Sequence, residues 1–271
     1  MAKYKKKRAR ELKHDKFRDS TMKLLDMAGD RLEGRGRTIL YGIGGLVVLA
    51  LIVGVFWKWS GRRADEARQA LGRAITIAST PISSAPSVGA ASGPSFTSAQ
   101  ERSQRAIEVF QQVAAKYGDP YRTEARYFIA TNMLATPDRA KGIAELTELS
   151  KDRNADVAAL AKFALAQAKE ADSKYEEAAG LYRELAVANN PLITAETANL
   201  RLAIAYKQLG KKKEAADLLF GIVDAARKAK DQEGSPKAQS QAARDAADEL
   251  QKLDSERYAQ LPPEAPPNSP F

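Results

Sequence analysis

The chain of 271 residues carries 43 Lys and Arg residues against 34 Asp and Glu, one histidine and no cysteine. The lack of cysteine excludes disulfides, thiolate metal sites, a lipoprotein anchor and a cysteine nucleophile, and the lone His14 has no companions for a metal site. The positive charge is confined to residues 1–63, which hold 16 basic and 6 acidic residues, whereas the other 208 hold 27 and 28. Because a nucleic-acid-binding domain normally shows a basic face, this balance argues against one.

Residues 1–37 form a basic lead with 13 Lys and Arg residues. Apolar residues recur in it at helical spacing, opposite charged ones: Phe17, Thr21, Leu24, Leu25, Ala28 and Leu32. The pattern predicts either an amphipathic helix lying on the inner leaflet, with its basic groups near anionic head groups, or a plain solvated or partner-bound helix.

Residues 38–59 are predicted to form a single transmembrane helix. Positions 38–57 carry no formal charge, and a helix of that length spans about 30 Å, the thickness of a bilayer's hydrocarbon core. Tyr41, Trp57 and Trp59 lie where interfacial aromatic residues are favoured. The long lead and the following Arg62 and Arg63 favour an uncleaved signal anchor over a cleaved signal peptide, and the length disfavours a buried core helix.

The basic residues on the two sides of this anchor predict its orientation. The lead holds 13 of them, against five just beyond the anchor: Lys58, Arg62, Arg63, Arg68 and Arg73. Because positive flanks tend to stay in the cytoplasm, we expect the N-terminus to be cytoplasmic and the large C-terminal part to be exported.

The exported part begins with a predicted helix over residues 64–78 and a flexible insertion of small residues and prolines over 79–96. Residues 97–258 then show a repeat, in which small residues recur 36, 36 and 37 positions apart: Ala106, Gly142, Ala178 and Ala215. Larger apolar residues follow four and seven positions after each, at Phe110, Leu146, Tyr182 and Leu219 and at Val113, Leu149, Leu185 and Ile222. Small residues also lie twelve positions before the last three, at Ala130, Ala166 and Ala203. The spacing predicts two closely packed helices per repeat.

This pattern resembles the tetratricopeptide repeat (TPR) family. The stretch LRLAIAYKQLGKKKEAADLL places family signature residues at Leu202, Ala203, Tyr206, Gly210 and Ala215, and SKYEEAAGLYREL places them at Tyr175, Ala178 and Tyr182. The longer period and the missing Trp mark divergent copies. The resemblance implies an all-α fold, with the transmembrane helix followed by a TPR-like solenoid of about four helix pairs. A capping helix is expected from Ser235 to about Tyr258, followed by a disordered Pro-rich tail over 259–271.

The layout as a whole resembles the YfgM-like group of bacterial proteins over roughly residues 17 to 230. The resemblance implies a single-pass protein of the bacterial inner membrane, with a cytoplasmic N-terminus and a periplasmic C-terminal domain. The implied partners are other proteins, namely SecYEG translocon subunits, exported polypeptides or periplasmic chaperones, together with membrane lipid along residues 38–59. No nucleic-acid partner is expected.

Enzyme motifs are missing from the sequence: it holds no HExxH, no G-x-S-x-G and no P-loop lysine. Gly42, Gly44 and Gly45 lie inside the predicted anchor, where they ease helix packing. We therefore expect no catalytic, cofactor-binding or metal-binding residues, and no enzyme activity.

A stacked repeat array offers a concave surface, lined by the first helix of each pair. Carrying over the family's inward-facing positions gives Glu124, Tyr127, Thr131, Leu134, Leu160, Phe163, Gln167, Glu170, Thr197, Leu200, Ile204 and Lys207. The candidate partner groove consists of Tyr127, Thr131, Phe163, Gln167, Leu200 and Ile204, unless the inserted loop, the cap helix or a second copy covers it. Two functions remain open: a module that holds exported polypeptides beside the translocon, or a scaffold that anchors a cell-envelope or division complex.

Overall fold

The computed structural model describes residues 61–82, 95–188, 190–232 and 234–264. By its contacts the chain divides into residues 1–65 and residues 66–271, and the second unit holds nearly all of the described residues. The predicted basic lead and the predicted transmembrane helix over 38–59 lie outside the described residues. Within the described ranges, no helix has both the length and the apolar character needed to cross a membrane.

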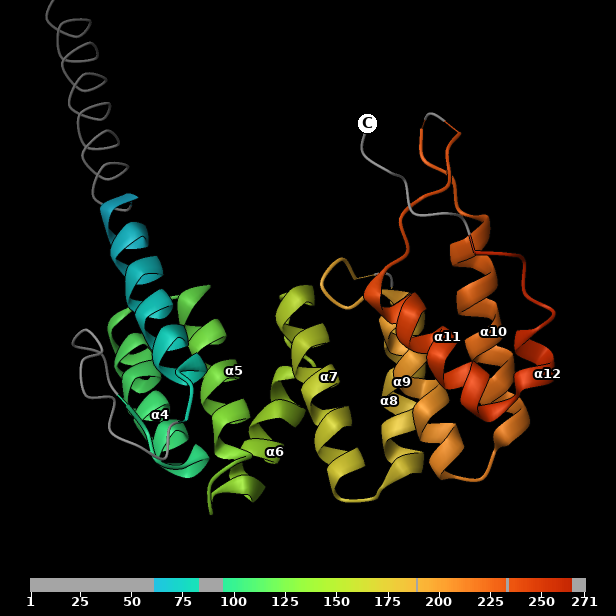
Figure 1. Ribbon diagram of the computed structural model, residues 1–271. Coiled ribbons are helices and arrows are strands. Elements are labelled where there is room, and N and C mark those ends of the chain that lie inside the picture. Colours follow the sequence, from blue (N-terminus) through green and yellow to red (C-terminus); the bar gives the residue numbers. More distant parts are fainter. Residues whose placement is uncertain (1–60, 83–94, 189, 233, 265–271) are drawn as a thin grey trace, which may run out of the picture. The chain divides into compact units, whose positions relative to one another are not determined.

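The second unit is built from helices that run up and down beside one another (Figure 1). A helix covers residues 61–79, where the sequence predicts one over 64–78. The helices that follow are α4 (Ala99–Lys116), α5 (Tyr121–Met133), α6 (Arg139–Leu149), α7 (Ala155–Ala171), α8 (Tyr175–Val187), α9 (Ala195–Gln208), α10 (Lys212–Lys228), α11 (Gln241–Leu253) and α12 (Ser255–Tyr258). Each contacts the next, and α5 also contacts α7, as α9 contacts α11.

Polar side chains fix where several of these helices begin. Ser98, Asn154, Thr194 and Ser240 precede α4, α7, α9 and α11, and the side-chain oxygen of each accepts a hydrogen bond from a backbone N–H in the first turn. These bonds satisfy amide groups that have no partner inside the helix. The tight turn before α10 needs a left-handed residue, supplied by Gly210 with φ +77°.

The small residues of the repeat lie where the two helices of a pair meet, and this confirms the predicted helical repeat. Six alanines at these positions are completely buried: Ala106, Ala130, Ala166, Ala178, Ala203 and Ala215. At the seventh, Gly142, even a methyl group is too large, because a Cβ there would lie 2.7 Å from the carbonyl oxygen of Ala130. The larger residues four and seven positions later are buried as well.

The apolar core of the described ranges follows the array as neighbouring clusters. In the first cluster, Ala67, Leu71 and Ala74 from the helix of residues 61–79 pack with α4 and α5. The rings of Phe110 and Phe128 stack there with centroids 4.9 Å apart. Burial of such apolar surface between successive helices is the main stabilising term of a repeat array.

The predicted flexible insertion over 79–96 has ends that are fixed to the array. Ile82 pairs with Phe96 in an isolated bridge, and Phe96 is buried. The guanidinium of Arg102 on α4 donates a hydrogen bond to the carbonyl of Thr80. Both ends of the predicted insertion thus contact the array, while residues 83–94 lie outside the described part, so the flexibility of the segment stays a prediction.

The closing helix is shorter than predicted. Residues 229–240 form a loop, in which Gly234 has φ +81° and Lys230 pairs with Pro236 in an isolated bridge. Helix α11 begins only at Gln241, where the Ser240 side chain accepts a hydrogen bond from the backbone N–H of Ala243. It ends at Leu253, and α12 adds one further turn.

The predicted disordered tail begins later than residue 259. Leu261 is buried in the cluster formed by α9, α10 and α11. Arg227 of α10 donates hydrogen bonds to the carbonyl of Pro262, at 2.5 Å, and to the hydroxyl of Tyr258, at 3.2 Å. Burial of Leu261 and the hydrogen bonds from Arg227 thus hold residues 258–262 against the array. The Pro-rich composition alone did not predict these contacts. Residues 265–271 lie outside the described part.

Candidate functional site

The structure divides the six predicted groove residues among three environments. Tyr127 and Thr131 of α5 meet Gln167 of α7 in one hollow. Phe163 of α7 packs toward α8, away from this hollow. Leu200 and Ile204 of α9 lie in a second hollow, against α11. The candidate partner groove is therefore divided between two separate hollows and the α7–α8 core.

The hollow between α5 and α7, which we call the apolar hollow, has a volume of about 420 Å³. Its lining is mostly apolar or small: Tyr127, Phe128 and Thr131 from α5, Leu134 directly after α5, Ala164, Gln167, Ala168 and Ala171 from α7, and Arg139 at the start of α6. The space exists because α7 contributes only alanines and one flexible amide to this surface. Alanine at these positions leaves room that a leucine would fill.

Tyr127 is the largest side chain in the apolar hollow. It is half-buried, and its ring meets Phe128 edge-on with centroids 5.2 Å apart. Burial raises the pKa of its hydroxyl above the ordinary value. The phenol therefore remains neutral at physiological pH and presents a ring face together with a polar tip.

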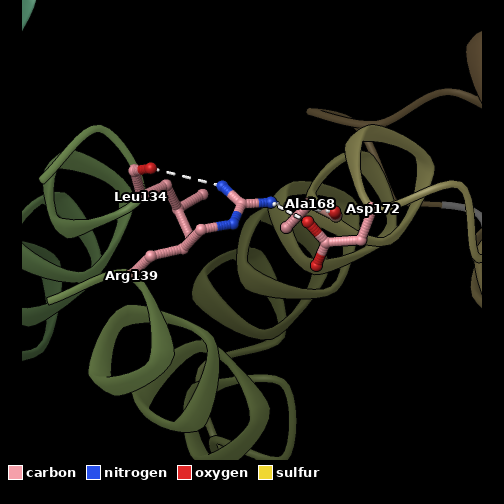
Figure 2. A network of polar contacts seen from close by, with 4 residues as sticks. All are labelled: Leu134, Arg139, Ala168 and Asp172. Carbon is pink, nitrogen blue, oxygen red and sulfur yellow. Dashed lines mark hydrogen bonds and ion pairs between the residues drawn. The ribbon is translucent and has the colours of Figure 1, made fainter. Parts of the chain in front are cut away.

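Arg139 is the only charged residue in the lining of the apolar hollow, and its charge is already paired (Figure 2). One terminal nitrogen donates to the carbonyl of Leu134 at 3.2 Å; the other donates to the carbonyl of Ala168 at 3.1 Å and to Asp172 at 2.8 Å. The arginine thus joins the C-terminal ends of α5 and α7, where a cation is electrostatically favoured. It limits one side of the hollow without leaving a free charge in it.

Sequence reasoning missed Arg139, although a signal was present. A cation in the first turn of a helix opposes the helix dipole, and Arg139 opens α6 directly after the turn Thr136-Pro137-Asp138. A residue placed against local preference in this way indicates a partner elsewhere, here the ends of two neighbouring helices.

Phe163 belongs to the core between α7 and α8 rather than to the apolar hollow. Its ring meets the completely buried Tyr182 edge-on, with centroids 5.7 Å apart. The Tyr182 hydroxyl donates to Glu170 at 3.0 Å, and Arg201 of α9 also pairs with Glu170. Burial raises the pKa of Tyr182 well above its ordinary value. Glu170, predicted to face the groove, instead connects α7, α8 and α9.

Leu200 is only 6% exposed, so it is not open to a partner as the candidate partner groove required. The closing helix α11 packs over it through Ala243, Ala246 and Leu250, with Ile204 at the margin. Lys207 of α9 adds an ion pair of 2.5 Å to Glu249 of α11. The cap helix, which was one of the open alternatives, therefore covers the α9 part of the predicted groove.

The second hollow, between α9 and α11, which we call the charged hollow, has a volume of about 470 Å³. Half of its ten lining residues carry charge: Arg201, Asp245, Asp248, Glu249 and Lys252. The hydrogen bond from Lys207 lowers the pKa of Glu249 below the ordinary value. The lining of the charged hollow therefore differs in chemistry from that of the apolar hollow.

In the part of the chain that the structure describes, no group of three or more His, Cys, Asp or Glu side chains could hold a metal ion.

No family model matches the chain, and no curated protein matches it. Among solved structures, it is similar to the nearly identical TPR-like repeats of a putative kinesin light chain from Podosopora anserina. The TM-score is 0.44, with 18% sequence identity over 59% of this chain and 82% of that one. A single-residue variant of the same repeats gives the same values. The helical repeat itself is established by its buried small residues.

Proposed function

We propose that this protein is a membrane-anchored protein-protein interaction module, and that its apolar hollow binds an apolar segment of another polypeptide. The observation that carries the proposal is the lining of that hollow: two partly buried aromatic rings, mostly small or apolar side chains, and a single arginine whose charge is already paired. Burial of a partner's apolar side chains there costs no desolvation of a free charge.

The partner's form follows from the polar groups beside the apolar floor. The Gln167 side chain is exposed, and its amide can both donate to and accept from a peptide backbone. Thr131 uses its hydroxyl proton on the carbonyl of Phe128, at 3.0 Å, so its oxygen is left to accept. These groups suit an extended or helical segment with one or two apolar anchors.

The finer proposal places this binding at the periplasmic side of a bacterial inner membrane, with residues 38–59 as the anchor. The uncharged run in the sequence and the resemblance to the YfgM-like group support it. We infer that the partners are exported polypeptides or chaperones close to the SecYEG translocon. A fixed scaffold for an envelope or division complex is the alternative.

A photo-crosslinking amino acid at Gln167 tests the binding site in intact cells. The matched control replaces Gln112, an exposed glutamine on α4, with the same photo-reactive residue. We expect crosslinks to other polypeptides from position 167 and none from position 112. Equal yields from both positions, or none from either, would contradict the proposed site.

The identity of the crosslinked material separates the two functions. Many different exported chains, enriched when translocation is arrested, support the holding function. A single partner at constant yield, unaffected by arrest, supports the scaffold.

The lack of native cysteine makes the orientation directly measurable. Ser20→Cys and Ser173→Cys place one thiol in the lead and one in the exposed turn before α8. In spheroplasts, a reagent that cannot cross the membrane should label position 173 and spare position 20. The reverse pattern would exclude the periplasmic location while leaving the hollow in place.

A further inference from the structure

The two most exposed large apolar side chains in the described ranges lie close together in the sequence, at the end of α8 and in the loop that follows it. Val187 at the end of α8 is 81% exposed, and Leu192 in the α8–α9 loop is 54% exposed. The next are Ile82 at 44% and Ile75 at 38%. Moving this exposed apolar surface out of water would be favourable, by about 25 cal/mol per Å².

Hydrogen bonds fix the conformation of residues 190–193, so the outward position of Leu192 is set by the structure of the loop. The buried Asn190 accepts hydrogen bonds from the backbone N–H groups of Leu192, at 2.8 Å, and Ile193, at 3.3 Å. Its side-chain amide donates to Asp156 at 2.9 Å, and Ile193 is buried in the core. The loop thus turns Ile193 inward and Leu192 outward.

Contacts between successive loops show at which end of the array this loop lies. Glu66, at the start of the unit, pairs with Lys116 at the end of α4. The following turn, at Asp119 and Pro120, shares a hollow with the α6–α7 turn over 150–154. Asp156, directly after that turn, holds Asn190 of the α8–α9 loop.

The series continues to the start of α11, where Ser240 donates to Glu196 at 2.6 Å. Each of these contacts joins one loop to the next, so the loops form a single face that includes the start of the unit at Glu66. The remaining turns lie at the opposite end, joined by pairs such as Arg139 with Asp172 and Lys211 with Glu176.

We propose that this face is turned to the lipid bilayer, and that Val187 and Leu192 insert into its interfacial region. The inference rests on the anchor included in the proposed function. Only eight residues, hence nine Cα-to-Cα steps, separate Trp57, the end of the uncharged run, from Glu66. They span about 14 Å as helix and at most about 32 Å fully extended, so this end of the array stays near the membrane surface.

The chemistry of the loop fits lipid better than a protein partner. Residues 187–194 carry no formal charge, so insertion needs no charged group to leave water. Two side chains offer far less than the roughly 800 Å² per partner of a stable protein interface. A chain already held at the membrane needs little further attraction, because its effective concentration there is high.

The test uses the full-length protein in vesicles of phosphatidylethanolamine and phosphatidylglycerol. Leu192→Cys carries an environment-sensitive fluorophore in one sample. Gln208→Cys, at the other end of α9, carries it in the control. With brominated lipids we expect at least a twofold loss of fluorescence at position 192 and no loss at position 208.

Equal quenching at the two positions, or none at either, would overturn the proposal. A blue shift at position 192 without quenching by brominated lipids would assign the loop to a second copy of the chain and also overturn it. Flotation of the same vesicles reports separately on the anchor. Protein that does not float refutes the anchor, whereas protein that floats without quenching at position 192 refutes only the loop contact.

Discussion

The apolar hollow and the charged hollow occupy the same place in the repeat, yet their linings are opposites. Both lie between the first helices of two successive pairs, α5 with α7 and α9 with α11. In the first helix of each hollow, positions 73 residues apart correspond: Tyr127 with Leu200, Phe128 with Arg201, and Thr131 with Ile204. In the second, positions 81 apart correspond: Ala164 with Asp245, Gln167 with Asp248, Ala168 with Glu249, and Ala171 with Lys252.

The difference follows from where each second helix stands in the array. Helix α7 has neighbours on several sides, so much of its surface is buried and rich in alanine. Helix α11 closes the array and needs a polar outer face to remain soluble. Its buried side carries Ala243, Ala246 and Leu250, and the rest is largely charged. One backbone arrangement therefore gives a mostly apolar hollow inside the array and a largely charged one at its end.

Weakening the contact of α11 with the core should have the largest effect on the free energy of unfolding. Leu250 is completely buried between α11 and the helices beneath it, so Leu250→Ala should lower the free energy of unfolding by about 2 to 5 kcal/mol. Chemical denaturation measures this. Lys252→Ala on the exposed side of the same helix is the control and should change stability by less than about 0.5 kcal/mol. Similar losses in both variants would mean that α11 does not close the core.

Forcing α5 and α6 apart should destabilise the part of the array that holds the apolar hollow. In Gly142→Ala the new methyl group meets the carbonyl oxygen of Ala130 at 2.7 Å and the Cβ of Met133 at 2.9 Å. We expect a loss of about 1 to 3 kcal/mol, because the helices must separate. Gly180→Ala on α8 is the matched control. Its methyl group meets nothing within 4 Å, so it should stabilise by up to about 1 kcal/mol. A destabilised control would show that helix separation is not the cause.

Binding should depend on the apolar hollow alone. Tyr127→Ser removes its central ring, and we expect crosslinking from position 167 to fall about tenfold, as for a central aromatic anchor. The control is Ile204→Ser in the charged hollow, at the position that corresponds to Thr131. It should leave the crosslinking yield within about twofold of wild type. Thermal melts of both variants must show a folded domain. If Ile204→Ser abolishes crosslinking and Tyr127→Ser does not, the binding face lies at α11.

The repeat could be predicted from the sequence because it rests on local rules. Ala178 and Ala215 mark the close helix contacts by size alone, and Gly142 shows the same rule at its strictest. The groove could be predicted only in part, because the exposure of Leu200 is decided by α11, some forty residues further on. Arg139 was missed for the same reason: its partners lie on α5 and α7, and no local pattern identifies them.

The smallest expected effect is a pH dependence confined to the charged hollow. The hydrogen bond from Lys207 and the nearby Lys252 lower the pKa of Glu249, so the folded state favours its charged form. The resulting stability is present above the ordinary carboxyl pKa of about 4.3 and is lost as the pH falls through the lower folded value. Because the pair is partly solvated, we expect roughly 0.2 to 1 kcal/mol.

Denaturation of the wild type and of Glu249→Gln at pH 7 and at pH 3 isolates this contribution. The difference in stability between the two proteins should shrink from pH 7 to pH 3, because the stabilisation by charged Glu249 is progressively lost as the pH falls below the ordinary carboxyl pKa toward the lower folded value. High salt at pH 7 should reduce it too, since screening weakens partly exposed pairs. The apolar hollow offers the contrast: Gln167→Ala removes no charge, so its effect on stability should be the same at both pH values. A difference for Glu249→Gln that persists undiminished at pH 3 would show that packing, rather than the ion pair with Lys207, holds α11 against α9 at this point.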